Sequence, residues 1–131
     1  ARMTDGGSVV TTSSQTALLA PPGLAAYAGT KAGADHIVRI AAVEYGAQNI
    51  RVNSLSPGFT PSAMTEGFLA MPAIEQAFVN EIPMGKLPST RDMANAALWL
   101  LSDESFMTGR MLDISGGQTL RRIPSATEMG F

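Results

Sequence analysis

The sequence predicts an α/β fold in which three short parallel strands alternate with helices. Three short stretches rich in aliphatic or β-branched residues, at 8–13, 50–56 and 111–114, have longer segments of helical periodicity between them. Strands joined through helices of this length pair in parallel, with right-handed crossovers. A parallel sheet of only three strands is unusually small, and it would leave a long apolar edge on the first strand. We therefore expect the chain to form part of a larger doubly wound domain.

The first strand and the first helix are predicted in the N-terminal third. Residues 8–13 read Ser-Val-Val-Thr-Thr-Ser, which is typical of a strand. Pro21-Pro22-Gly23 then indicates a loop. From Leu24 to Tyr45 there is no proline and the apolar residues fall at helical spacing, so we expect one long helix, with Gly46 as its C-cap.

The second strand, residues 50–56, alternates with period two and ends at Pro57-Gly58. Residues 60–88 contain many prolines and glycines, and we expect short helical pieces near 63–70 and 73–80. A segment this long inside a compact domain is usually functional.

The last helix and strand follow this segment. Thr90 is the predicted N-cap of a helix that runs to about Ser102. Met111–Ile114 is the third strand, ended by Gly116-Gly117, and residues 118–131 show no clear period.

Composition excludes several classes of function. The chain has 131 residues with nine Lys+Arg against eleven Asp+Glu, so it lacks the basic excess that nucleic acids or anionic lipids require. It has no cysteine and one histidine, which excludes disulfides, thiolate nucleophiles and metal sites built from cysteines or several histidines. No apolar run approaches the ~20 residues of a membrane helix. We expect no metal, no nucleic acid and no membrane partner, and a cytoplasmic location is the simpler expectation.

A hydroxyl, a phenol and an ammonium group lie where such a fold binds ligands. Ser14 directly follows the first strand, and open α/β sheets bind ligands at the carboxyl ends of their strands. Tyr27 and Lys31 are four residues apart near the start of the first helix, so their side chains share one face. An ammonium group beside a phenol favours the phenolate, as a general acid–base requires. We expect Tyr27 to exchange protons while Ser14 holds a substrate oxygen beside it.

Simpler interpretations stay open for these residues taken singly. A lone Tyr-x-x-x-Lys is most often a surface pair, and Ser14 alone is most often a hydrogen-bonding residue at a strand end. A serine hydrolase would need His36 as its base, but the adjacent Asp35 projects about 100° away on the helix, and no Gly-x-Ser-x-Gly motif is present. We expect His36 to be solvated or at an interface, and Arg121-Arg122 to belong to a solvated tail.

Four blocks of the sequence together resemble the short-chain dehydrogenase/reductase family, which includes 3-oxoacyl-carrier-protein reductases. The blocks are GSVVTTSS at 7–14, YAGTKAG at 27–33, IRVNSLSPG at 50–58 and TGRMLDISGG at 108–117. They stand in the family's order and spacing. The resemblance implies a Rossmann-like fold and an NAD(P)-dependent oxidoreductase that interconverts a secondary alcohol and a ketone.

The resemblance also implies catalytic roles for three residues. Ser14 looks like the serine that binds and polarises the substrate carbonyl. Tyr27 looks like the proton donor in reduction and acceptor in oxidation. Lys31 looks like the residue that hydrogen-bonds the nicotinamide ribose and lowers the cost of forming the Tyr27 phenolate.

Further binding residues follow from the same resemblance. Pro57 and Gly58 resemble the turn beneath the nicotinamide, with a backbone contact near Thr60. Ser62 keeps a hydroxyl where the family often has threonine. The segment 60–88 corresponds to a substrate lid that begins near Met64, and Ser14, Gln15 and Met64 are the expected substrate contacts. Four apolar residues either form the lid's apolar face or are ordinary packing: Phe59, Phe68, Leu69 and Met71.

The family's glycine-rich phosphate loop and its cofactor-selecting residue precede the matching region, and neither occurs in this sequence. Residues 1–131 therefore resemble the C-terminal, catalytic half of one Rossmann-like domain, and NAD and NADP remain equal candidates for the cofactor. In the family the long helix joins an interface between subunits, so we expect a homo-oligomer, a dimer or a tetramer. The alternative is a catalytically inert fragment or pseudoenzyme that acts as an oligomerisation module.

Overall fold

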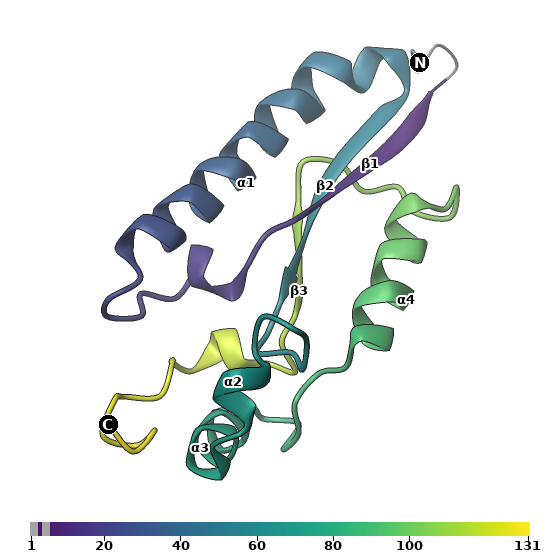
Figure 1. The fold of residues 1–131 in the computed structure, drawn as a ribbon. Coiled ribbons are helices and arrows are strands. Elements are labelled where there is room, and N and C mark those ends of the chain that lie inside the picture. The colour runs from purple at the N-terminus through teal and green to yellow at the C-terminus, as the bar shows by residue number, and fades with distance from the viewer. Residues whose placement is uncertain (1–2, 4–5) are drawn as a thin grey trace.

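The computed structural model describes residue 3 and residues 6–131 (Figure 1). Residues 1–2 and 4–5, which belong to the predicted domain, lie outside the described part. The strands and α-helices are, in chain order, β1 (Gly7–Thr12), α1 (Ala25–Tyr45), β2 (Ile50–Pro57), α2 (Glu66–Leu69), α3 (Pro72–Glu81), α4 (Thr90–Leu101) and β3 (Met111–Ile114). Two single-turn 3₁₀ helices, η1 (Gln15–Ala17) and η2 (Gly46–Gln48), precede and follow α1, and a third, η3 (Gln118–Leu120), follows β3.

The three strands form one parallel sheet in the order β1-β2-β3. Val9 pairs with Val52, and Ser56 pairs with Asp113. The predicted fold class is confirmed, because each crossover passes through a helix. The carboxyl ends of the strands consequently meet at one edge of the sheet.

The two long helices cover opposite faces of this sheet (Figure 1). On one face, α1 packs through Val38 and Ala42 against Ile50 and Val52 of β2, and all four are buried. On the other face, Leu100 of α4 is fully buried.

Polar side chains of the sheet hold the end of α4 in place. The Ser8 hydroxyl donates a 2.8 Å hydrogen bond to the Leu100 carbonyl. Arg51 donates to the carbonyls of Leu100 and Ser102, at 2.8 and 2.9 Å. These bonds satisfy carbonyls that the helix end leaves without an intrahelical partner.

Two helix boundaries differ from the prediction in their chemistry. The N-cap of α4 is Ser89 and not Thr90: the Ser89 hydroxyl accepts from the Asp92 N–H, and the Asp92 carboxylate accepts from the Ser89 N–H, which makes a capping box. Gly46 directly follows α1 as predicted, but its φ of −58° is right-handed. The left-handed residue is Asn49, with φ 58°, because the chain continues through η2 before it turns.

The segment 60–88 contains the two expected helical pieces with shifted bounds. The first, α2, is a single turn and is shorter than the predicted 63–70, whereas α3 extends one residue beyond 73–80 at each end. Pro72 opens α3, where its missing N–H costs no hydrogen bond. Of the helices in the described residues, none is both long enough and apolar enough to cross a lipid bilayer.

Within the described residues, β1 pairs only with β2, so its other edge is open. An apolar hollow lies beside this edge, lined by Met3, Val9, Ala41, Tyr45, Gln48, Ile50 and Val52. The expected neighbour of β1 in a larger doubly wound sheet stays a prediction.

Candidate active site

The predicted site lies where the end of β1 meets the first turns of α1. The Lys31 ammonium donates a 2.9 Å hydrogen bond to the backbone carbonyl of Thr12, the last residue of β1. Its Nζ also lies 5.8 Å from the centroid of the Tyr27 ring. The helix spacing thus brings the phenol ring and the cation together as expected, and the strand supplies the acceptor that holds the cation there.

Tyr27 is accessible to a ligand. Its side chain is 39% exposed, although it belongs to a helix that packs on the sheet. The Thr30 hydroxyl donates at 2.7 Å to the backbone carbonyl of Tyr27 and not to its phenol. The joint action of the Tyr27 phenol and the Ser14 hydroxyl on one substrate oxygen stays a prediction.

Ser14 caps η1 at the end of β1. Its buried hydroxyl oxygen accepts from the Thr16 N–H at 3.2 Å and from the Thr16 hydroxyl at 3.0 Å. Ser14 therefore acts as a hydrogen-bonding residue at the strand end, which was the simpler interpretation. Both contacts use lone pairs, however, so the hydroxyl proton remains available to a carbonyl oxygen.

A buried carboxylate that the sequence analysis did not assign to the site stabilises this junction. The Ser13 hydroxyl donates a 2.7 Å hydrogen bond to Asp35 Oδ2, and both residues are buried. Within the described residues, Asp35 Oδ1 has no hydrogen-bond partner. Asp35 lies four residues after Lys31 and so shares its helix face. The spacing that predicts the Tyr27–Lys31 pair could therefore also have placed Asp35 at the site. His36, beside it, is exposed as expected.

The turn after β2 lies at the same edge of the sheet. Gly58 donates its N–H to the Ile114 carbonyl at 3.1 Å. A Cβ on Gly58 would lie 2.8 Å from Ser115 Cα, which is closer than atoms can approach, so only glycine fits between β2 and β3 here. Pro57 ends β2 opposite Ile114. The sharp stop predicted from Pro57-Gly58 therefore reflects close packing of two chain segments.

Thr60 and Ser62 use their polar groups within the turn itself. The Thr60 hydroxyl donates to the Gly58 carbonyl at 2.9 Å, and the Thr60 carbonyl accepts from the Thr65 hydroxyl at 2.7 Å. The Ser62 N–H donates to Thr65 Oγ1 at 2.9 Å, and the two hydroxyls lie 3.2 Å apart. The two residues thus stabilise the turn that precedes α2, and their cofactor contacts stay a prediction.

The remaining predicted residues divide between buried and exposed positions. Gln15 is buried, and within the described residues its Oε1 has no partner. Met64 is 78% exposed, near the start of the segment 60–88 that is the predicted lid. Of the four predicted lid residues, Phe59 stacks on Phe78 of α3 with 3.9 Å between ring centroids, Phe68 and Met71 are exposed, and Leu69 is half-buried.

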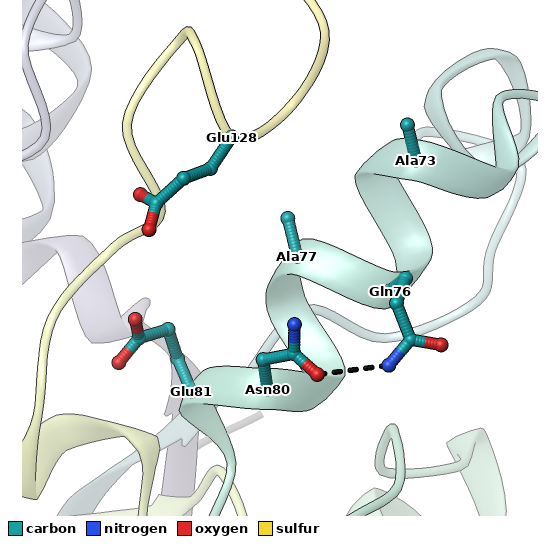
Figure 2. A pocket seen from close by; sticks show the side chains of 6 residues that line it. All are labelled: Ala73, Gln76, Ala77, Asn80, Glu81 and Glu128. Atoms are coloured by element: carbon teal, nitrogen blue, oxygen red, sulfur yellow. Dashed lines mark hydrogen bonds between the residues drawn. The ribbon is translucent and has the colours of Figure 1, made fainter.

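The Arg121-Arg122 pair is exposed but is not merely solvated. Arg121 donates to the Asn80 carbonyl at 2.9 Å, and Arg122 forms ion pairs with Glu81 and Glu128, both at 2.7 Å. A cavity of about 190 Å³ lies between α3 and this tail (Figure 2), and Tyr27 is not among the residues that line it. The described residues contain no cluster of three or more His, Cys, Asp or Glu side chains suited to a metal ion.

The donors at the junction of β1 and α1 can bind oxygen atoms of a ligand. The Lys31 ammonium has three N–H groups, of which the Thr12 carbonyl takes one. Two N–H groups remain for ligand hydroxyls beside the accessible Tyr27 phenol.

Comparison with known proteins gives a consistent result. Residues 1–119 match the sequence profile described as enoyl-(acyl carrier protein) reductase. The trans-4-hydroxycyclohexanecarboxylate dehydrogenase of Sinomonas cyclohexanicum is 39% identical over 115 residues, which is 87% of this chain and 42% of that protein. The 7α-hydroxysteroid dehydrogenase of Escherichia coli K12 is 37% identical over 86% of this chain and 44% of its own length.

Solved structures show the same fold. A short-chain type dehydrogenase/reductase from Mycobacterium ulcerans superposes with a TM-score of 0.90 and 35% identity, covering 96% of this chain and 46% of that one. A 7α-hydroxysteroid dehydrogenase complexed with NADH and 7-oxo glycochenodeoxycholic acid gives a TM-score of 0.81 at 37% identity, covering 86% and 44%. The chain thus spans less than half the length of each of these four proteins.

Proposed function

Because this chain belongs to the short-chain dehydrogenase/reductase family, we propose that it carries the catalytic residues of an oxidoreductase that interconverts a secondary alcohol and a ketone. Tyr27, Lys31 and Ser14 are the proposed catalytic residues. The observation that carries the proposal is the position of the Lys31 ammonium, bonded to the end of β1 and 5.8 Å from the ring centroid of an accessible Tyr27.

In this proposal each of the three residues has a distinct task. NAD or NADP, when bound, supplies the hydride in reduction and accepts it in oxidation. Tyr27 gives its phenolic proton to the carbonyl oxygen during reduction and takes the hydroxyl proton during oxidation. Lys31 stabilises the phenolate with its positive charge, and Ser14 donates its free hydroxyl proton to the same substrate oxygen.

The available donors fit the nicotinamide riboside half of such a cofactor. The two free N–H groups of Lys31 match a pair of ribose hydroxyls. The turn of Pro57 and Gly58, with Thr60 and Ser62 after it, lies at the same sheet edge and would contact the nicotinamide. No described residues form a glycine-rich phosphate loop, so we assign no site for the adenosine half.

For the substrate, we propose an alicyclic alcohol or its ketone. The named relatives act on a hydroxycyclohexanecarboxylate and a hydroxysteroid, both of which are ring alcohols. Gln15, with its unpartnered buried amide oxygen, and Met64, at the start of the lid segment, are the proposed contacts beside Ser14. Cyclohexanol derivatives are therefore the first compounds to assay.

We also propose that the protein works as a homo-oligomer. The outer face of α1 exposes Ile37, Ile40 and Val43, with 67, 47 and 83% of their surface accessible. A row of large aliphatic side chains this exposed is typical of an interface between chains.

The function is tested with paired tyrosine and lysine variants of the protein as it is isolated. Tyr27→Phe should lower kcat by about 100-fold or more, the range of a lost general acid–base, whereas Tyr45→Phe on the same helix should keep wild-type turnover. Lys31→Met should weaken cofactor binding in a fluorescence titration, and Lys86→Met should not. Undiminished turnover by Tyr27→Phe would remove the acid–base role. Absence of both turnover and cofactor binding from an intact oligomer would favour the inert assembly module.

A further inference from the structure

The C-terminal segment, residues 121–131, contacts α3 near both of its ends. Arg121 and Arg122 contact Asn80 and Glu81 at one end of the helix. At the other end Gly130 lies against Ala73, since a Cβ on Gly130 would stand 3.8 Å from the Ala73 Cβ. The segment therefore contacts α3 near both of its ends, and in Figure 1 it is drawn in yellow to the left of that helix.

Arg122 is the centre of the contact between the two segments. Its guanidinium donates to both carboxylate oxygens of Glu128 at 2.7 Å and forms a third contact of 2.7 Å with Glu81 of α3. Glu128 also accepts from the N–H and the hydroxyl of Ser125, at 2.8 and 2.7 Å. Figure 2 shows Glu128 opposite Glu81 and Ala77 across the cavity between tail and helix.

Arg122 and Glu128 each favour the charged form of the other. Hydrogen bonds from Arg122 and then from Ser125 hold the pKa of Glu128 well below its ordinary value. The hydrogen bond to Glu128 raises the pKa of Arg122. A bidentate guanidinium–carboxylate pair with a second carboxylate beside it has a defined geometry, unlike an ordinary surface pair.

Helix α3 contacts the turn after β2, which belongs to the candidate active site. Phe78 of α3 stacks on Phe59 with ring planes 11° apart, and Phe59 is the residue after Pro57-Gly58. The chain leaving α3 is held as well: the Met84 N–H donates to the Gly116 carbonyl at 3.2 Å, and Pro83 lies against Gly117. A displacement of α3 would therefore reach the turn at the carboxyl end of β2.

We propose that residues 121–131 form a clasp that holds α3 of the substrate lid in place, with Arg122 as a positioning residue for substrate binding. Arg122 acts through α3 and touches no reacting atom. Loosening the clasp forces substrate binding to order the lid, so the KM for the substrate should rise while kcat stays nearly constant. The link to substrate rests on the proposed function, whereas the mechanical link between tail and α3 does not.

The mechanical link is measured by hydrogen exchange of residues 72–81 in the isolated protein. Arg122→Gln should reduce protection of these amides by about three- to tenfold, because it removes the ion pair with Glu81 on α3. Glu128→Gln should reduce protection less, because the Arg122–Glu128 pair lies within the tail and its loss leaves the Arg122–Glu81 ion pair in place. The double variant should be little worse than Arg122→Gln alone, since the loss of Arg122 already removes the contact with Glu128. Arg122→Lys keeps the positive charge but lacks the planar guanidinium. Its protection of residues 72–81 should therefore lie between that of wild type and that of Arg122→Gln.

Arg91→Gln is the matched control, because it removes the same charge from an exposed position on α4. It should leave the exchange of 72–81 unchanged. Unchanged exchange in Arg122→Gln would overturn the proposal, and so would an equal loss of protection in every segment, which would indicate general destabilisation.

The catalytic consequence is measured separately in the same variants. With a turned-over alcohol or ketone, Arg122→Gln should raise KM by about the factor by which protection falls. A loss confined to kcat would overturn the positioning role. If the protein turns over no such substrate, the proposed function fails while the exchange result still decides whether the clasp exists.

Discussion

The hydroxyl of Ser13 donates a 2.7 Å hydrogen bond to the buried carboxylate of Asp35 on α1. One residue earlier in β1, the Thr12 carbonyl accepts from Lys31, one turn before Asp35. Two successive residues at the end of the strand are thus tied to two successive turns of the helix. This double contact sets the position of the helix start, and with it Tyr27, relative to the strand end that carries Ser14.

Removing the Asp35 carboxylate should destabilise this junction. Asp35→Ala leaves the buried Ser13 hydroxyl without its acceptor, and we expect a loss of about 1–3 kcal/mol in the free energy of unfolding. Asp35→Asn, which keeps a side-chain oxygen as acceptor, should lose less. Urea denaturation measures both, with exposed Asp103→Ala as the control expected to stay within about 0.5 kcal/mol of wild type. Equal stability of the alanine and asparagine variants would contradict a hydrogen-bonding role for Asp35.

A side chain at Gly58 should be poorly tolerated. The added Cβ of Gly58→Ala would meet the Ser115 backbone at 2.8 Å, so either β3 or the turn must move, at a cost of about 1–3 kcal/mol. Gly67→Ala in α2 is the matched control, because its Cβ would meet nothing within 4 Å. That change should be neutral or stabilising by up to about 1 kcal/mol, since alanine favours the helix. Chemical denaturation of both variants checks the contrast, and a fully stable Gly58→Ala would show that the close contact relaxes freely.

The start of α4 should depend on Ser89 more than on Thr90. Ser89→Ala removes the hydroxyl that accepts from the Asp92 N–H, and we expect a loss of about 1 kcal/mol in unfolding free energy. Thr90→Ala places a better helix former in the first turn and should cost less. Thermal unfolding distinguishes the two variants. A larger loss of stability in Thr90→Ala than in Ser89→Ala would indicate that Thr90 is the N-cap.

The same capping box should make stability depend on acid. The Ser89 hydroxyl and then the Ser89 N–H lower the pKa of Asp92 below its ordinary value of 3.8. Because the pKa is lower in the folded chain, the carboxylate stabilises the fold above the unfolded-state pKa and loses this effect as the pH falls through the folded-state pKa.

Asp92→Asn should therefore be less stable than wild type at neutral pH, and the difference should close only below pH 3.8. Denaturation of both proteins across a pH series measures it. In a Ser89→Ala background the pH-dependent part should shrink, since the largest cause of the lowered pKa is gone. A gap that is constant down to strong acid would assign the effect of Asp92 to something other than its charge.

The sequence by itself determined the kinds of element, their order, the parallel sheet and the meeting of Tyr27 with Lys31. These features follow from local spacing: period two for the strands, helical period for α1, and four residues between two side chains on one helix face. Helix ends were less predictable, because Ser89 and Thr90 are both good caps and the Asp92 partner decides between them.

Only the tertiary structure decided which groups hold the candidate site together. The Lys31 contact to Thr12 joins residues 19 apart, the Ser13–Asp35 bond joins residues 22 apart, and the Arg121 contact to α3 spans 41 residues. No local pattern encodes such pairs, because a buried aspartate or an exposed arginine finds its partner only after the helices have packed on the sheet. For that reason the sequence left Asp35 unassigned and indicated a solvated tail where the folded chain has a clasp.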